Sequence, residues 1–340
     1  MVVLLCGAAL VLLSSVRLTR GLDRLGELLG LSEGLLGLLT ALGANSPEIA
    51  AAVTALGANS PEIAAAVTAL MSGAHDVGYG LVLGSNLFNL AGLLGLSAVL
   101  IGRITQDRAG LLLHGSVAVV TTLAAVALVM GWLAPIWTLA VLLGVMTPYV
   151  TLLALSPSRL RRLPLPGAKA LAASLYLVDS GCLEEPGNAP GSTPGDWGPV
   201  WMILPMLAAI VGGSVEMVKA ALSLGQNWHV PNAVIGALVL AALTGLPNVY
   251  SALRLARQGR GGAVVSETLN SNTLNLLIGI TIPALVFGLG RGGAASVLEA
   301  WWLLGLTLAA LLLLFRKPYL SRRGGALIIA LYLVFVAVRL

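Results

Sequence analysis

The sequence predicts an all-α membrane protein of about ten transmembrane helices, arranged as two inverted five-helix repeats. Of its 340 residues, 58% are hydrophobic and only 10% are charged, which is more apolar surface than a soluble domain of this length can bury. The apolar residues form runs of about twenty, the length of a helix that crosses a bilayer. A polar pattern in the first half also returns in the second half, as in inverted-repeat transporters. Aromatic residues are scarce at 5% and polar and apolar residues do not alternate, so a β-barrel is not expected.

Ten apolar stretches alternate with polar connections along the chain. The longest connection contains a Pro/Gly-rich run at 186–195, which is typical of a flexible linker. We therefore expect a first five-helix repeat in 1–155, a cytoplasmic linker in 156–197 and a second five-helix repeat in 198–340. The predicted spans are 1–16, 35–70, 78–101, 111–130, 135–155, 198–222, 231–253, 262–287, 297–315 and 324–338.

The basic residues predict the orientation of these spans. Of the 19 lysines and arginines, 16 lie in the odd-numbered connections, and cytoplasmic loops are the ones that carry the basic excess. We expect a multi-pass protein of the plasma or inner membrane with both termini extracytoplasmic. The net charge of +5 is then a topology signal, and nucleic acid is not an expected partner. The lipid bilayer and small inorganic cations are the expected partners, and the oligomeric state stays open.

Motifs of enzymes are not found. The sequence has no Walker loop, no nucleophile motif and no HExxH, so an ATP-driven pump or a membrane hydrolase has no support. Cys6 lies in the first predicted span and Cys182 in a predicted cytoplasmic loop, which argues against a disulfide or a zinc site. The protein is therefore expected to be no enzyme and to use no cofactor, with ions as its transported substrates.

The repeated pattern consists of a proline in one span and an Asn pair in the next. Pro61 is followed by Glu62 and precedes Asn86 of the next span. Pro247 is followed by Asn248 and precedes Asn272 by the same interval. The two copies are five spans apart, an odd number, so the second copy enters the membrane upside down. In transporters built this way, the substrate site lies near the midplane where the repeats meet.

A second repetition lies within one predicted span. Residues 41–54 (ALGANSPEIAAAVT) recur unchanged as residues 55–68. A single helix over 35–70 would be about 54 Å long, whereas the hydrocarbon core is about 30 Å thick. Only one copy can therefore lie at the depth of the predicted midplane site. The proline-to-asparagine interval that the two halves share favours the copy with Glu62. Glu48, in the other copy, is expected nearer the cytoplasmic end as a possible duplicate site; a duplication made in cloning or assembly is the alternative.

The residues of this pattern suit cation binding. An acid within a span is costly and usually functional, and Pro61 frees a backbone carbonyl beside Glu62. The pairs Asn86/Asn89 and Asn272/Asn275 each share one helix face and supply uncharged oxygens. The alternatives are a protonated glutamate bonded to a neighbouring helix and asparagines that only join helices by hydrogen bonds.

These motifs resemble a known family. Gly57–Glu62 (GANSPE) with Gly84–Asn89 (GSNLFN) is similar to the first signature of the cation/calcium exchanger superfamily, the sodium/calcium exchanger membrane region. Leu243–Asn248 (LTGLPN) with Asn270–Asn275 (NSNTLN) resembles its second signature in a degraded form. The resemblance implies a ten-helix plan and the exchange of Ca²⁺ or another cation against Na⁺ or H⁺.

The resemblance also implies roles for individual residues. Glu62 would be the cation-binding carboxylate of the first half. Ala58 and Thr244 would occupy corresponding positions whose backbone carbonyl helps to bind the ion. Asn86 and Asn272 would fall on the amide-or-acid position of the Ser-Asn motif.

The second half departs from the family at Asn248, where the family has its second glutamate. A dication facing one carboxylate would leave a net charge of +1 in a poorly polarisable site, so a single carboxylate suits Na⁺ or H⁺ better. Glu267, one turn before Ser271, is a candidate replacement, and Glu62 and Glu267 together would then bind Ca²⁺ or Na⁺. Asn248 and Ser271 are also expected among the cation-binding residues. The alternative is that Glu267 is solvated in a cytoplasmic vestibule.

Three functions follow from this pattern. The first is a secondary active antiporter that exchanges Ca²⁺ or a related cation for Na⁺ or H⁺ by alternating access. The second is a monovalent cation/proton exchanger, favoured by Asn248. The third is a degenerate membrane protein that binds ions without transporting them. Outside the pattern, Glu216 and Lys219 are expected to form a structural ion pair.

Overall fold

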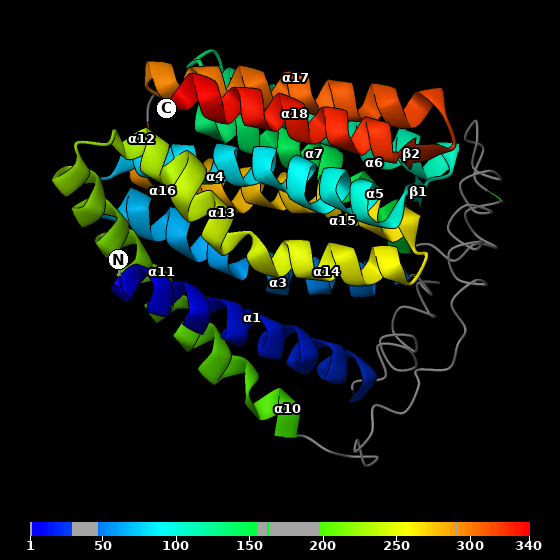
Figure 1. Cartoon of the computed structure of the whole chain (residues 1–340), viewed down its shortest axis with the longest axis horizontal. Coiled ribbons are helices and arrows are strands. Elements are labelled where there is room, and N and C mark those ends of the chain that lie inside the picture. The colour runs from blue at the N-terminus through cyan, green and yellow to red at the C-terminus, as the bar shows by residue number, and fades with distance from the viewer. Residues whose placement is uncertain (1, 29–46, 155–161, 163–197, 290) are drawn as a thin grey trace.

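The computed structural model is built almost entirely from helices (Figure 1). It describes the backbone of residues 2–28, 47–154, 162, 198–289 and 291–340, and the side chains of 2–18, 59–152, 162, 198, 201–289 and 291–340. Most of the predicted linker at 156–197 and the start of the long second span at 35–46 lie outside these residues.

A helix, continuous or interrupted, lies on each of the ten predicted spans. By length and apolar composition alone, six of the described helices can cross a membrane, or seven when the bent pair around Gly245 counts as one span. In chain order the helices are α1 (Val2–Leu28); α3 (Pro47–Met71); α4 (His75–Asn89), η1 (Leu90–Gly95) and α5 (Leu96–Ile101); α6 (Arg108–Val129); α7 (Pro135–Ala154); α10 (Gly198–Trp201) and α11 (Ile203–Trp228); α12 (Asn232–Val234), η2 (Ile235–Leu240), α13 (Ala241–Thr244) and α14 (Leu246–Arg257); α15 (Gly261–Leu274), η3 (Asn275–Thr281) and α16 (Ile282–Phe287); α17 (Ala294–Arg316); and α18 (Arg322–Arg339).

The long helices lie side by side in three groups (Figure 1). At one side, α1 packs along α11. The middle group contains α3, α4, α14 and α15, and within it α3 and α15 each contact the other three helices. On the far side lie α6, α7, α17 and α18, of which α6 and α17 pack against each other. The middle group is therefore shielded on both sides by other helices.

Short strands join two connections at one end of this bundle. Strand β1 (Arg103–Thr105) pairs antiparallel with β2 (Tyr319–Ser321), with Ile104 opposite Leu320. The turn between α14 and α15 lies at the same end, because a Cβ on Gly261 would be 2.4 Å from the carbonyl oxygen of Thr105. The connections after the third, seventh and ninth helical stretches thus meet at one end, and all three are basic.

The opposite end gathers connections with even numbers. A cavity of about 350 Å³ there is lined by Asp76 from the second connection, Asn232 from the sixth and Arg291 from the eighth. Odd and even connections therefore lie at opposite ends within the described chain, as expected if successive helices cross in alternate directions.

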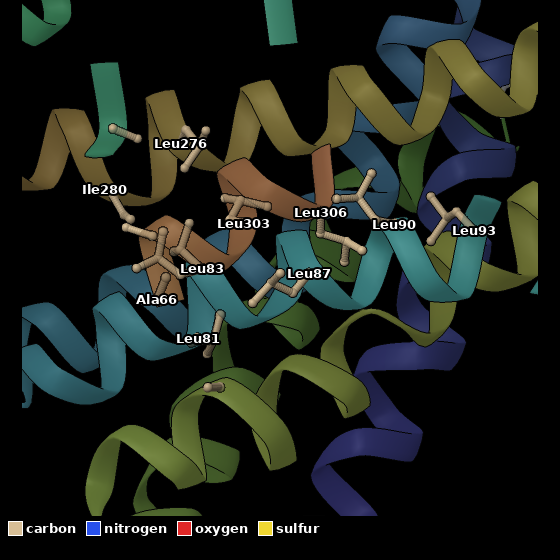
Figure 2. Close-up of a cluster of buried hydrophobic side chains, with 14 of the residues drawn as sticks. Ala66, Leu81, Leu83, Leu87, Leu90, Leu93, Leu276, Ile280, Leu303 and Leu306 are labelled. Atoms are coloured by element: carbon tan, nitrogen blue, oxygen red, sulfur yellow. The ribbon is translucent and has the colours of Figure 1, made fainter. Parts of the chain in front are cut away.

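The interior of the bundle is apolar and tightly packed. Buried leucines, isoleucines and alanines of α3, α4, η1, η3 and α17 form one cluster (Figure 2). Along α4, Gly80 and Gly84 let the backbone approach the interrupted seventh stretch: a Cβ on Gly84 would be 2.3 Å from the carbonyl oxygen of Ala237. Small residues one turn apart permit such contact between membrane helices. This contact holds α4, from the first half of the chain, directly against η2, from the second half.

The outer surface of the bundle is apolar as well. Exposed leucines and valines are scattered over α1, α6, α7, α17 and α18, as expected for helices that face lipid. Trp132, Trp137 and Trp301 are exposed near the end that carries the even connections. Exposed tryptophans near helix ends are typical of proteins whose helices end at the membrane–water interface.

The long second stretch forms one helix over its described part. Helix α3 begins at Pro47 and ends at Met71, so Glu48 and Glu62 lie on a single helix. Their separation in the chain corresponds to about 21 Å along the axis. The two acids therefore lie at different levels of the bundle, and the prediction that only the Glu62 copy lies near the midplane stays a prediction.

Candidate cation-binding site

Polar side chains from α3, α4, α14, α15 and η3 meet in the middle of the bundle. We call this group the Glu62 cluster. Each member is at most 5% exposed although it lies within an apolar helical stretch. Its members are Asn59, Glu62, Asn86, Asn89, Asn248, Asn272 and Asn275.

Interruptions in the helices place these side chains. Pro61 lies inside α3 one residue before Glu62, and a proline leaves the carbonyl four residues earlier without its helical partner. Between α13 and α14 the chain bends by 45° at Gly245, just before Asn248. A Cβ on Gly245 would lie 2.7 Å from the Phe88 ring, so this position accommodates only glycine without a shift.

A π-helical segment begins at the end of each Asn pair. Helix α4 ends at Asn89 and η1 begins at Leu90, whereas α15 ends at Leu274 and η3 begins at Asn275. Segments of this kind are uncommon and occur frequently at functional sites. The two halves thus share the local widening of the helix as well as the Asn spacing.

Glu62 is held by amides from the second half of the chain. Asn248 Nδ2 donates to Glu62 Oε1 at 3.1 Å and also to Asn59 Oδ1 at 2.7 Å. Asn275 Nδ2 donates to the other carboxylate oxygen, Oε2, and to Asn86 Oδ1, the latter at 3.1 Å. Both oxygens of the acid therefore accept a hydrogen bond in a site that excludes water.

The two Asn pairs bond to each other reciprocally. The Nδ2 atoms of Asn86 and Asn272 each donate to the backbone carbonyl of the other residue at 3.1 Å. Asn275 donates to Asn86 Oδ1 at 3.1 Å, and Asn89 donates to Asn272 Oδ1 at 3.2 Å. The four bonds form two equivalent pairs. Exchanging Asn86 with Asn272 and Asn89 with Asn275 converts each bond into the other member of its pair. The bonds therefore follow the sequence repeat.

Oxygen atoms of the cluster remain without a hydrogen-bond donor. The side-chain carbonyl oxygens of Asn89, Asn248 and Asn275 accept no hydrogen bond from the described residues, and Asn59 Nδ2 is an unpartnered donor. Buried polar atoms of this kind are costly unless something binds them. Three amide oxygens beside one carboxylate form a set of hard ligands suited to Na⁺ or Ca²⁺.

The remaining predicted residues lie in different environments. The Thr244 hydroxyl is buried and donates to Leu240 O at 2.8 Å, within the same helical stretch. Ser271 is fully buried with an unpartnered Oγ. Glu267 is 3% exposed, and no hydrogen bond joins it to the Glu62 cluster. The prediction that Glu62 and Glu267 share one ion is not tested by these contacts.

Two of the predicted residues cannot be judged from side-chain contacts. The backbone of α3 includes both Ala58 and Glu48, but their side chains lie outside the described ones. The roles predicted for them therefore stay predictions. Among the described residues, no three His, Cys, Asp or Glu side chains gather closely enough to hold a metal ion.

Sequence reasoning missed two contributors to the cluster. Asn59 was part of the motif without a role, yet its Oδ1 accepts from Asn248. Ser214 of α11 donates to the carbonyl of Pro61 at 3.4 Å and is fully buried. The position of Asn59, three residues before Glu62, was the available signal, because residues at this spacing lie on one helix face.

Other buried polar contacts lie outside the cluster. His114 Nδ1 bonds to the Tyr149 hydroxyl at 2.8 Å, and that hydroxyl donates to Asn270 Oδ1 at 2.6 Å. Near the end of the bundle that carries the even-numbered connections, Glu299 and Arg339 form a buried ion pair with an N–O distance of 2.7 Å. The predicted pair of Glu216 and Lys219 is present at 2.9 Å and is exposed, as expected of a structural ion pair.

The fold and the Glu62 cluster together define the class of the protein. Apolar helices long enough to cross a membrane enclose a group of oxygen ligands at the junction of two similar helix sets. This is the construction of a helical membrane transporter for small cations. The sequence profile of the sodium/calcium exchanger protein family matches residues 1–156 and 198–340, so the chain belongs to that family. Family and fold are those of transporters.

Individual relatives agree with this assignment. The chain is 32% identical over 134 residues to sodium/potassium/calcium exchanger 4 of Mus musculus, a match that covers 36% of this chain and 21% of the relative. It is 24% identical over 327 residues to the putative antiporter CaxA of Alkalimonas amylolytica, covering 94% of this chain and 90% of that protein. The crystal structure of an H⁺/Ca²⁺ exchanger, CAX, superposes with a TM-score of 0.73 at 14% identity, covering 99% and 81% of the two chains. The match thus spans about a fifth of the mouse relative's length and nearly all of CaxA.

Proposed function

We propose that the protein is a secondary active antiporter that exchanges Ca²⁺ or a related cation for Na⁺ or H⁺ at the Glu62 cluster. The observation that carries this proposal is the Glu62 carboxylate, buried at 1% exposure and hydrogen-bonded by Asn248 and Asn275, whose own side-chain oxygens have no donor among the described residues. An acid held this way within apolar helices has a high desolvation cost, which a bound cation offsets. Relatives named as sodium/potassium/calcium and H⁺/Ca²⁺ exchangers support the same class of substrate.

The proposed mechanism is alternating access between two inverted halves. Residues 1–155 would form one five-helix half and 198–340 the other, with 156–197 as the cytoplasmic linker. The reciprocal bonds of Asn86 and Asn272 support a two-fold relationship of the halves around the site. The basic connections at one end support an orientation with that end in the cytoplasm of a plasma or inner membrane and both termini outside.

Ion flux in proteoliposomes tests the proposal. The purified protein is expected to drive Ca²⁺ uptake when an outward Na⁺ or H⁺ gradient is imposed. Glu62→Gln keeps the size of the side chain but removes its charge, and it should lower the initial rate at least about a hundredfold, since a lost charge–ion contact in a buried site is worth about 3 kcal/mol or more. Glu216→Gln, at the exposed ion pair, is the matched control and should transport normally. An unchanged rate in Glu62→Gln would remove the site from the mechanism.

The second candidate function is exchange of monovalent cations or protons. It is favoured by Asn248, which leaves one carboxylate in the cluster and therefore a charge of −1. A single Na⁺ neutralises that charge, whereas Ca²⁺ leaves a charge of +1 in a medium of low polarisability. The remaining candidate, an ion-binding protein without transport, predicts binding with no flux under any gradient.

Restoring an acid at position 248 separates the first two candidates. Asn248→Glu places a second carboxylate beside Glu62 Oε1 and raises the charge of the cluster to −2. For a monovalent exchanger, the variant should gain Ca²⁺ binding by about tenfold or more over the wild type, or about 1.4 kcal/mol. If the wild type exchanges Ca²⁺ for Na⁺ at a rate comparable to that of Asn248→Glu, the monovalent candidate is wrong.

A further inference from the structure

Glu267 is a second buried acid that the Glu62 cluster does not use. It lies on α15 and is 3% exposed, and neither of its carboxylate oxygens has a partner at close hydrogen-bond geometry, although the Ser251 hydroxyl is near enough to interact with the acid. A carboxylate in such surroundings is unfavourable unless it is neutralised or bound. Its location therefore requires an explanation of its own.

The neighbours of Glu267 come from the seam between α14 and α15. These helices are antiparallel and joined by a short turn at 258–260 (Figure 1), which places Ser251 opposite Glu267. Ser251 is the polar side chain of α14 that lies close to the acid. Ser271 follows Glu267 by one turn on the same helix face and is fully buried with an unpartnered Oγ. One carboxylate and two hydroxyls thus face a single seam.

Helix α15 keeps this seam apart from its other polar faces. Asn272 and Asn275 bond to residues of α3 and α4, and Asn270 bonds to Tyr149 of α7. Glu267 lies between these two faces by the helical period of about 100° per residue. Its level along the axis is about one turn, or about 5 Å, from that of Asn248. The seam therefore lies between the Glu62 cluster and the basic end of the bundle.

The exposed guanidinium of Arg254 is the charged group close to this seam. It lies one turn beyond Ser251 on α14 and acts on Glu267 electrostatically, but no ion pair between them occurs among the described residues. Direct pairing with Arg254 thus does not neutralise Glu267. The nearby positive charge disfavours a dication more than a monovalent ion.

We propose that Glu267, Ser251 and Ser271 form a second cation station, separate from the Glu62 cluster and selective for a monovalent cation such as Na⁺. The inference rests on the proposed function, since it gives an ion on its way between the Glu62 cluster and the basic end an intermediate binding site. One carboxylate and hydroxyl oxygens match the charge and hardness of Na⁺. Asn248 Oδ1, also unpartnered, is the oxygen of the Glu62 cluster that an ion leaving this station would meet on α14.

Binding of radioactive Na⁺ to the purified full-length protein in nanodiscs tests the second station. Glu62→Gln removes the charge of the first site and is expected to retain one bound Na⁺ per chain. That ion should be lost, with affinity lowered at least about tenfold, in Glu62→Gln/Glu267→Gln and weakened in Glu62→Gln/Ser251→Ala. Arg254→Gln in the Glu62→Gln background should bind Na⁺ as tightly or more tightly, because a competing charge is removed.

The outcomes separate the station from the proposed function. If Glu62→Gln binds no Na⁺ while the wild type exchanges cations, the station is wrong and the function stands. If Glu267→Gln leaves the number and affinity of bound Na⁺ unchanged from the wild type, the station is also wrong. A wild type that neither binds nor moves any cation overturns the proposed function itself. Thermal unfolding without Na⁺ is the folding control: Glu267→Gln should be at least as stable as the wild type, since a buried charge without an ion-pair partner has been removed.

Discussion

Asn86 and Asn272 exchange two hydrogen bonds, each Nδ2 atom donating to the backbone carbonyl of the other residue at 3.1 Å. The two residues lie 186 positions apart, on α4 and α15. Each occupies the same place in its half, because it follows a proline of the preceding helical stretch by the same interval. The contact between them therefore joins the two copies of the sequence repeat at their equivalent points.

This equivalence predicts matched effects of mutation. Asn86→Ala and Asn272→Ala should each lower the free energy of unfolding by about 1–3 kcal/mol, because each leaves a buried carbonyl without a donor. The double variant should lose about as much as the two single variants together, since each change removes a different one of the two bonds. Thermal unfolding in detergent measures all three, and Asn227→Ala, at an exposed position on α11, is the control. A loss of stability in only one of the two single variants would contradict the reciprocal contact.

The close approach of α4 to η2 predicts a steric effect at Gly84. A Cβ there would lie 2.3 Å from the carbonyl oxygen of Ala237, a backbone atom that does not move aside as a side chain would. Gly84→Ala should destabilise the protein by about 1–3 kcal/mol, as overpacking does. Gly144→Ala on α7 is the matched control because no atom lies within 4 Å of the added group, and it should be neutral or stabilising. Equal melting temperatures for both variants would be evidence against the close contact.

The buried pair of Glu299 and Arg339 predicts an asymmetry between single and double variants. Glu299→Gln leaves the Arg339 charge buried without its partner and should cost about 3–5 kcal/mol. Replacing both residues, as in Glu299→Leu/Arg339→Leu, should restore most of the stability because no charge then remains to be neutralised. Unfolding of the purified protein measures the effect. The exposed pair Glu216/Lys219 provides the comparison, and its single variants should change stability little.

The tandem repeat in the second stretch predicts that one copy is dispensable. Deletion of residues 41–54 leaves a single ALGANSPEIAAAVT run with its proline, asparagine and glutamate. Cation flux in proteoliposomes should persist in this deletion and in Glu48→Gln, since Glu62 makes the contacts with Asn248 and Asn275. A loss of flux in Glu48→Gln with normal flux in Glu62→Gln would assign the site to the first copy.

Much of the fold was predictable because it depends on local properties. The apolar runs marked the positions of all the helical stretches, since each must be long and apolar enough to lie in lipid. Glu62 and the two Asn pairs were likewise recognisable as polar residues in apolar surroundings. Six of the predicted residues meet in one cluster: Glu62, Asn86, Asn89, Asn248, Asn272 and Asn275. The equal spacing of proline and asparagine in the two halves predicted that equivalent positions would meet.

Other features depend on how helices are rotated and at what depth they meet. Its spacing from Glu62 places Asn59 on the same face of α3, but only the approach of α14 gives it Asn248 as a partner. Glu299 and Arg339 are 40 residues apart on α17 and α18, and the pair forms because those helices are neighbours. Glu267 likewise lies on its own helix face, with no hydrogen bond to the cluster.

The sequence by itself determined that this chain crosses a membrane, that its halves repeat one pattern, and that an acid and several amides lie inside it, because hydropathy and spacing are encoded residue by residue. Only the tertiary structure decided which amide meets which oxygen, which oxygens remain without a donor, and which acid stands apart. Those outcomes depend on the rotation and depth of packed helices, and these are set by contacts such as Gly84 against Ala237 between residues far apart in the chain.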